Sequence, residues 1–169
     1  GPTWSEQTPF GPIVSEPQLQ QIDSIVRQTI DSGAEPLIGG CCMEFENGGT
    51  FYEPTVLTKV SSAMEAVREE VFGPVLTVQS FDDEDEGYEL ASHEKYGLAA
   101  GVHTGDVNKA LRAIREIKAG TVWVNRYGRT FDYIIPTGGY KSSGIGKDLG
   151  RQAVEASLRQ KSVLIDFTD

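Results

Sequence analysis

This sequence of 169 residues lacks the marks of several large protein classes. No apolar run approaches the ~20 residues that a membrane-spanning helix requires, and no basic-plus-apolar signal segment opens the chain. Its 15 Lys and Arg residues are outnumbered by 25 Asp and Glu residues, which gives a net charge of −10. Binding to a phosphate backbone needs clustered basic side chains. We therefore expect neither a nucleic acid nor a membrane as a partner.

Cysteine and methionine are also scarce. The two cysteines, Cys41 and Cys42, are adjacent, and neighbouring cysteines rarely bridge each other because the geometry is strained. Without a disulfide scaffold, a reducing compartment and hence a cytoplasmic location are expected. No methionine precedes Met43, so Gly1 is not expected to be a natural start. We expect a piece of a longer protein or a processing product.

Hydrophobic spacing and turn residues predict alternating helices and strands. Helices are expected over residues 16–32, 61–69, 82–93, 106–118 and 147–159. Strands are expected over residues 36–38, 51–60, 74–81, 98–103, 121–125 and 162–167. Because parallel strands need crossover connections, this alternation favours an α/β fold with a mostly parallel sheet flanked by helices.

Few residues form a pattern that could carry chemistry. The run 143–150, S-G-I-G-K-D-L-G, misses the dinucleotide fingerprint by one position and follows no strand, so a tight turn is the better interpretation. The acidic run 82–86 is typical of a helix start. Acidic surroundings raise the pKa of a thiol, which disfavours Cys41 and Cys42 as nucleophiles, and His93 and His103 are isolated. We predict no catalytic residue and no metal site.

Several stretches together resemble a known family. They read EEVFGP at 69–74, GTVWVN at 120–125 and GGYKSSGIGKDLG at 138–150, with support from FYEPTVL at 51–57 and YGLAAGVHT at 96–104. In this order and spacing they resemble the C-terminal half of the aldehyde dehydrogenase superfamily. The resemblance implies that residues 1–160 are the C-terminal part of the catalytic domain and that residues 161–169 are a terminal oligomerisation strand.

The resemblance also implies a reaction and a cofactor. Family members oxidise an aldehyde to a carboxylic acid with NAD or NADP, using a cysteine nucleophile and a glutamate base. Both of those groups, and the nucleotide-binding fold, would lie upstream of Gly1, so this chain alone is expected to be inactive and to bind no cofactor tightly. In the family, the residue at Glu70 holds the nicotinamide-side ribose, and the residue at Phe72 packs beside that sugar and the nicotinamide. Simple core packing is the alternative for Phe72.

Residues 126–137 match the loop that lines the substrate entrance in the family. The implied substrate-binding residues are Asn125, Tyr127, Arg129, Thr130 and Thr137. Many members carry an aromatic residue where this chain has Thr137. One hypothesis is that Arg129 favours an aldehyde with an anionic or polar tail, because guanidinium pairs well with carboxylate. The alternative is an exposed arginine without such a role.

Two other functions remain open at this point. The chain could be an isolated oligomerisation or folding module without a catalytic role, or a nucleotide-binding protein built on the 143–150 loop. The apolar segment SVLIDF at 162–167 resembles the family's terminal strand, which adds to a neighbouring subunit's sheet. An unpaired apolar strand favours aggregation, so we expect a homo-oligomer, either a dimer or a tetramer.

Overall fold

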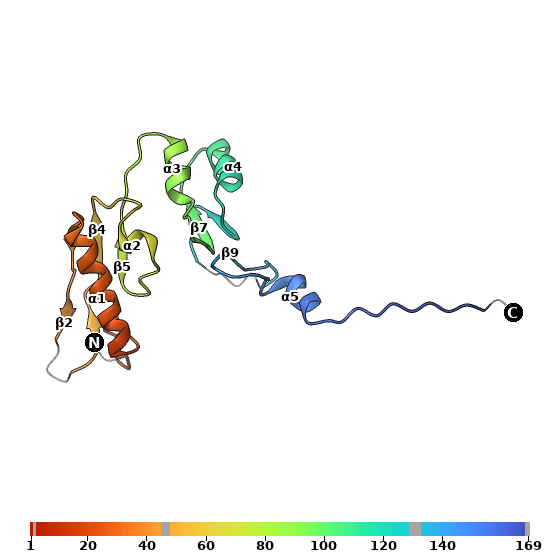
Figure 1. Cartoon of the computed structure of the whole chain (residues 1–169), viewed down its shortest axis with the longest axis horizontal. Coiled ribbons are helices and arrows are strands. Elements are labelled where there is room, and N and C mark those ends of the chain that lie inside the picture. Colours follow the sequence, from red (N-terminus) through yellow and green to blue (C-terminus); the bar gives the residue numbers. More distant parts are fainter. Residues whose placement is uncertain (2, 45–47, 129–132, 168–169) are drawn as a thin grey trace. The chain divides into compact units, whose positions relative to one another are not determined.

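The structure, a computed structural model, describes residues 1, 3–44, 48–128 and 133–167. These residues belong to two compact units, Gly1–Leu90 and Ala91–Asp169. Helices and strands occur in both units (Figure 1), which confirms the predicted α/β class. The predicted separation of residues 161–169 as an oligomerisation strand concerns a second chain and stays a prediction.

The first unit is built on the long helix α1, Glu16–Asp31. Ser15 caps it, because its Oγ accepts a hydrogen bond from the Gln18 N–H at 3.4 Å, and a proline is tolerated in the first turn, where N–H groups lack partners. Apolar residues at helical spacing make one buried face of α1. That face belongs to a core formed by Leu19, Ile22, Ile25, Val26, Tyr52, Leu57, Ala66 and Val71.

Short strands pair beside this helix. The elements are β1 (Glu35–Ile38), β2 (Cys42–Met43), β3 (Phe51–Tyr52), β4 (Thr55–Thr58), α2 (Glu65–Arg68), β5 (Val75–Thr77) and α3 (Glu84–Ala91). One sheet has the order β1-β4-β5, and β2 pairs with β3 separately. β4 and β5 are parallel, with α2 in the connection between them, whereas β1 runs antiparallel to β4.

Thr29 joins the two helices of this core. Its side chain is fully buried, and its Oγ1 donates to the Ile25 carbonyl at 2.7 Å. The same oxygen accepts a hydrogen bond from the Ala66 N–H at 3.0 Å. One hydroxyl therefore satisfies a buried backbone donor at the start of α2 that otherwise has no partner inside the helix.

The Thr29→Val substitution is expected to destabilise the first unit by about 1–3 kcal/mol, because it leaves the Ala66 N–H buried without an acceptor. Thr29→Ser is the matched control, since it keeps the hydroxyl and loses one methyl group, at a cost of about 1 kcal/mol. Urea denaturation followed by the amide resonances of this unit measures both. A Thr29→Val protein as stable as Thr29→Ser would contradict the assigned role of the hydroxyl.

The second unit repeats the strand–helix–strand arrangement. Its elements are β6 (Tyr96–Gly97), β7 (Ala99–Val102), α4 (Val107–Glu116), β8 (Thr121–Val124), β9 (Tyr140–Lys141) and α5 (Gly150–Ala156). β7 and β8 are parallel, and α4 lies in the connection between them. Asp106 caps α4 by accepting from the Asn108 N–H at 2.7 Å. The buried residues Ala110, Ala113 and Ile117 form the inner side of this region.

The strand pairing corrects the prediction of a mostly parallel sheet. Among the described strands, β4/β5 and β7/β8 are parallel, while β1/β4, β2/β3 and β6/β9 are antiparallel. The predicted strand 51–60 is interrupted at Glu53 and Pro54, where proline lacks the N–H that a ladder needs. Both observed parallel pairs have a helical crossover, as expected.

Two elements predicted near the C-terminus also differ from those in the structure. The helix predicted over 147–159 begins only at Gly150, because Asp148 pairs with Thr137 in a β-bridge and Leu149 has a φ of 63°, outside the helical region. Residues 162–167 are exposed and form no strand with any other part of the described chain. No helix in the described ranges is long and apolar enough to cross a membrane.

Candidate functional site

The segment Glu69–Pro74 connects α2 to β5 and has one buried anchor. Val71 is buried in the core of the first unit. The residues on either side of it, Glu70 and Phe72, are exposed, and Phe72 retains 75% of its accessible surface. Among the described residues the Glu70 carboxylate has no hydrogen-bond or ion-pair partner. Both predicted cofactor-binding side chains are therefore exposed to solvent, and core packing does not account for Phe72.

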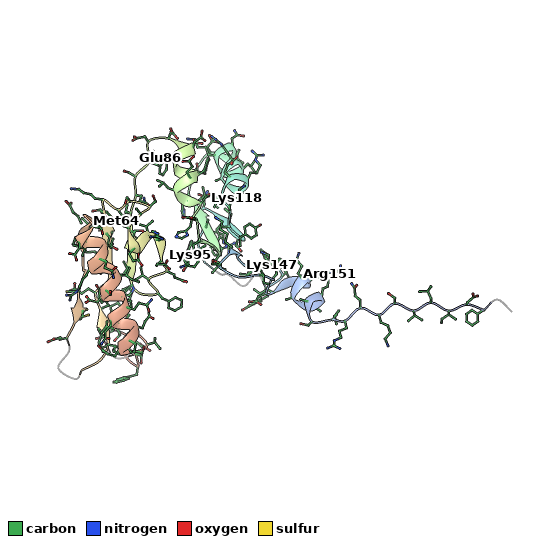
Figure 2. The ribbon with its side chains drawn as sticks, viewed as in Figure 1. Met64, Glu86, Lys95, Lys118, Lys147 and Arg151 are labelled. Atoms are coloured by element: carbon green, nitrogen blue, oxygen red, sulfur yellow. The ribbon has the colours of Figure 1, made fainter. Side chains whose placement is uncertain are left out.

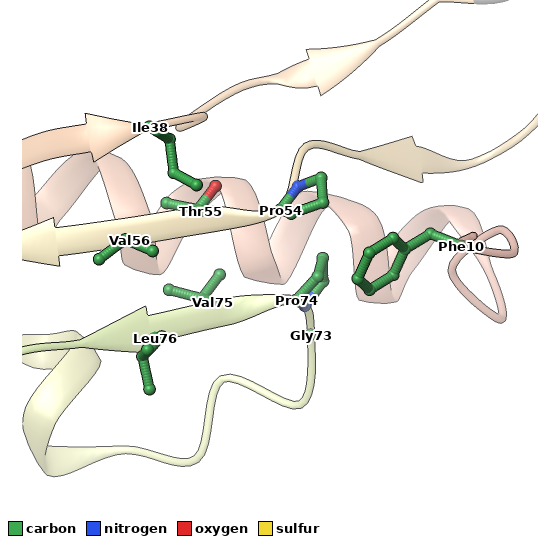
Figure 3. A pocket seen from close by; sticks show the side chains of 9 residues that line it. All are labelled: Phe10, Ile38, Pro54, Thr55, Val56, Gly73, Pro74, Val75 and Leu76. Carbon is green, nitrogen blue, oxygen red and sulfur yellow. The ribbon is translucent and has the colours of Figure 1, made fainter.

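The backbone of Phe72 is in the left-handed region, with a φ of 53°. For a residue other than glycine this conformation costs about 1–2 kcal/mol. The end of the segment is tied to the sheet, since the Thr55 N–H donates to the Pro74 carbonyl at 2.8 Å. A shallow pocket of about 290 Å³ lies at this end and is lined by apolar side chains and Thr55 (Figure 3). Because it contains no titratable group, it offers no acid–base chemistry.

In the second unit, Asn125 follows β8 and forms a bridge to the turn after β7. Its Oδ1 accepts from the Thr104 N–H at 2.8 Å, and its Nδ2 donates to the Thr104 carbonyl at 2.9 Å. Asn125 has a φ of 55°, which asparagine tolerates better than most residues. In this structure the Asn125 amide holds the loop through Thr104. To contact a substrate, the amide would have to bind the substrate in addition to Thr104, or release Thr104.

Tyr127 and Thr137 lie at the two ends of the predicted entrance loop. The Tyr127 ring stands edge-on to Trp123, with ring centroids 5.1 Å apart, and 77% of Tyr127 is exposed. Thr137 exchanges two backbone hydrogen bonds with Asp148, each of 2.7 Å. Arg129 and Thr130, the other predicted substrate-binding residues, lie outside the described residues. The loop is thus anchored by an aromatic pair at one end and a β-bridge at the other.

The Gly-rich segment 138–150 is packed against the protein's own backbone. The Lys147 ammonium, labelled in Figure 2, donates to the Gly138 carbonyl at 3.0 Å and lies 5.4 Å from the centre of the Tyr140 ring. Ser143 Oγ accepts from the Gly97 N–H at 3.1 Å. A Cβ on Gly138 or Gly139 would approach backbone atoms within 3.0 Å. These glycines allow close backbone contacts.

The sequence matches a known protein family over most of its length. The model of the aldehyde dehydrogenase family matches residues 1–163. The chain belongs to the aldehyde dehydrogenase family. It is 42% identical over 166 residues to an aldehyde dehydrogenase of Aspergillus niger, and 42% identical over 163 residues to one of Emericella nidulans. These matches cover 96% of this chain and 32% of each relative, so the chain spans about a third of their length.

Solved aldehyde dehydrogenase structures have the same fold. The NAD+ complex of the Bacillus cereus enzyme matches with a TM-score of 0.90 at 38% identity, covering 97% of this chain and 33% of that one. Apo betaine aldehyde dehydrogenase of Staphylococcus aureus matches with a TM-score of 0.87 at 37% identity, covering 98% and 34% respectively. The resemblance found in the sequence is confirmed, and so is the predicted α/β class.

Sequence reasoning missed the contacts that hold the candidate residues. Gln18 in α1 donates from Nε2 to the carbonyls of Val71 and Phe72, at 3.2 and 3.3 Å. Thr104 is the unforeseen partner of Asn125. Helical spacing offered one hint, since Gln18 lies one turn before the buried Ile22 and therefore on the same face of α1. No group of three or more potential metal ligands occurs in the described part of the chain.

The two cysteines are free, exposed thiols in acidic surroundings. Cys41 Sγ donates to Glu53 Oε2 at 3.3 Å, and this hydrogen bond raises the pKa of the Cys41 thiol above its ordinary value. Cys42 loses part of its solvent shell to neighbouring atoms, and this partial burial is the main cause that raises its pKa, with the charge of Asp23 adding to it. A raised pKa leaves little thiolate at neutral pH, which disfavours both residues as nucleophiles.

Glu53→Ala is expected to make Cys41 react at lower pH, because the protonated thiol loses the carboxylate that stabilises it. The rate of alkylation by iodoacetamide, measured against pH in a Cys42→Ser background, gives the midpoint for Cys41. Glu44→Ala makes the same charge change without removing a contact to Cys41, and should leave the midpoint near its original value. An unshifted midpoint in Glu53→Ala would show that the hydrogen bond does not control this thiol.

Proposed function

We propose that the whole protein oxidises an aldehyde to a carboxylic acid with NAD+ or NADP+. One observation carries the proposal: the family segment Glu69–Pro74 presents an unpaired carboxylate, Glu70, and an exposed aromatic ring, Phe72, side by side on an anchored backbone. A carboxylate is suited to accept two hydroxyl hydrogen bonds from a ribose, and an aromatic face is suited to cover the adjoining ring. These residues fit the nicotinamide-side half of the cofactor.

The reaction balances as aldehyde, water and NAD(P)+ giving carboxylic acid, NAD(P)H and a proton. When bound, the cofactor supplies the hydride acceptor. Glu70 would fix the ribose and Phe72 would limit the positions open to the attached ring, which orients the reactants before chemistry occurs. We place the nucleophile and the general base outside this chain, since neither cysteine has an environment that favours thiolate. Alone, the chain should bind the cofactor only weakly.

The substrate side of the proposal rests on the loop after β8. We assign Asn125, Tyr127 and Thr137, together with Arg129 and Thr130, to the substrate entrance. The aromatic pair of Tyr127 and Trp123 supports an apolar wall at one end. Thr137 in place of an aromatic residue would leave more room near the Gly-Gly turn. A preference for aldehydes with anionic tails depends on Arg129 pairing with a carboxylate.

A chimera tests this function. This chain would replace the matching third of the Aspergillus niger relative, and aldehyde-dependent NADH or NADPH formation would be measured by absorbance. We expect turnover by the chimera and none by the chain alone. A second chimera, made at the same junctions with the corresponding third of the Emericella nidulans relative, controls for damage at the junctions. Turnover in that control but not in the first chimera would refute the proposed function.

We further propose that the protein is a cytoplasmic homo-oligomer, a dimer or a tetramer, joined through residues 161–169. Support comes from the exposed apolar side chains near that end, among them Leu164 at 94% and Phe167 at 90% exposure. Free cysteines are compatible with a reducing compartment. Light scattering of the chain with and without residues 161–169 measures the assembly. Identical masses for both would exclude these residues as its cause.

A further inference from the structure

The backbone at Phe72 is held in a conformation that its own side chain does not stabilise. Its φ of 53° is one that residues other than glycine rarely adopt. With 75% of its surface exposed, the phenyl ring contributes little packing to offset this strain. A strained residue persists only when the surrounding structure imposes the strain. The cause must therefore lie in the contacts of the neighbouring backbone.

Gln18 makes the contact that distinguishes this conformation. Its single Nε2 amide donates to two consecutive carbonyls, Val71 at 3.2 Å and Phe72 at 3.3 Å. In an extended strand successive residues face opposite sides, so consecutive carbonyls do not converge on one donor. Here they converge because the chain turns at Phe72. An amide nitrogen with two hydrogens can satisfy both acceptors.

The same face of α1 also fixes the residues on each side. Val71 is buried, with 8% exposure. After Phe72, a Cβ on Gly73 would stand 2.5 Å from Ile22 Cδ1, so any larger residue there would require the fully buried Ile22 side chain to shift. Ile22 lies one helical turn after Gln18. The helix thus sets the path of the backbone before and after Phe72, and Gln18 sets the turn between.

We propose that Gln18 is a positioning residue for cofactor binding, acting through the main chain of Val71 and Phe72. This role rests on the proposed function, in which Glu70 and Phe72 contact the nicotinamide side of NAD(P)+. By holding the turn in the free protein, Gln18 orients the two exposed side chains before the cofactor arrives. When a loop is already ordered before the ligand arrives, binding does not have to supply the free energy of ordering it. Loss of Gln18 should therefore weaken cofactor binding without unfolding the unit.

The test uses NMR of the whole chain. A strong intraresidue NOE between the amide proton and Hα of Phe72 reports its positive φ. We expect that NOE to weaken in Gln18→Leu and in Gln18→Asn, whose amide is too short to reach both carbonyls. Gln20→Leu is the matched control on the same helix, because among the described residues the Gln20 side chain bonds to Glu16 alone, at 3.1 Å. The core amides of the first unit should keep their wild-type shifts in all three variants.

The second measurement is a titration with NAD+ at millimolar concentration, followed at the amides of Glu70 and Phe72. We expect shifts in the wild-type chain and in Gln20→Leu, and about tenfold weaker binding in both Gln18 variants. An NOE that survives in Gln18→Leu and Gln18→Asn would overturn the positioning role and leave the proposed function standing. Unchanged NAD+ affinity despite a lost NOE would overturn it as well. A wild-type chain that shows no response to NAD+ would overturn the cofactor assignment, and the role of Gln18 with it.

Discussion

Gly120→Ala is expected to destabilise the second unit by about 3 kcal/mol or more, at the upper end of what overpacking costs. A Cβ at this position would stand 1.7 Å from the Gly138 carbonyl oxygen and 2.8 Å from its carbon. Both obstacles are backbone atoms, so no side-chain rotation relieves the clash. To accept the methyl group, the Gly138–Gly139 segment must move away from the start of β8.

Gly105→Ala is the matched control, because a Cβ there would meet nothing within 4 Å. Its effect should stay within about 0.5 kcal/mol of zero, as for most surface substitutions. Fluorescence of Trp123 in β8 during urea denaturation compares the two variants. If Gly120→Ala and Gly105→Ala have similar stabilities, the close approach of Gly138 to Gly120 is not a feature of the folded protein in solution.

The helices with local signals could be predicted from the sequence to within about two residues. Residues 16–32 were expected to be helical, and α1 covers Glu16–Asp31, because a capping serine, an apolar stripe and a following glycine all act within one stretch of chain. The expected helix 106–118 became α4, Val107–Glu116, for similar reasons. These sequence signals are local, so they can be recognised without knowing what the helix packs against.

The pairing of strands was harder to predict from the sequence, because the residues that pair are far apart along the chain. No strand was predicted over the residues of β9, yet β9 pairs antiparallel with β6, about 44 residues earlier. At Gly97 in β6, a Cβ would stand 3.2 Å from Tyr140 Cβ in β9 and 2.7 Å from the Lys118 carbonyl oxygen. A glycine's role in such a contact is invisible until the contacting backbone is known. The antiparallel partner of β4 was missed because pairing direction is not encoded in a strand's own pattern.

For the candidate site, the sequence offered candidate residues but not the contacts that hold them. Glu70 and Phe72 were predicted from a family motif, and the structure adds that both are exposed around the buried Val71. The left-handed backbone of Phe72 could not be predicted, because phenylalanine disfavours it and a glutamine 54 positions away holds it. Asn125 shows the opposite case, since asparagine itself tolerates a positive φ.

Glu70→Gln should produce the largest functional effect, a fall of about 10- to 100-fold in kcat/KM for NAD+ in the chimeric enzyme. Hydrogen bonds to a charged acceptor contribute about 1.5–3 kcal/mol, and each 1.4 kcal/mol is a factor of ten. Glutamine keeps the length and shape of the side chain. It replaces one acceptor oxygen with a donor, so it cannot accept both ribose hydroxyls.

The effect should fall on the cofactor and not on the aldehyde, because Glu70 is assigned to the ribose alone. KM for the aldehyde, measured at saturating NAD+, should therefore stay within about twofold, since a group that binds only the cofactor contributes no uniform binding to the second substrate. Glu65→Gln provides the matched charge change in the first turn of α2 and should leave both constants unchanged. If Glu65→Gln and Glu70→Gln lower kcat/KM for NAD+ equally, the net charge of the unit, and not a contact of Glu70, would be the cause. A Glu70→Gln enzyme with unaltered NAD+ kinetics would remove the carboxylate from the cofactor site.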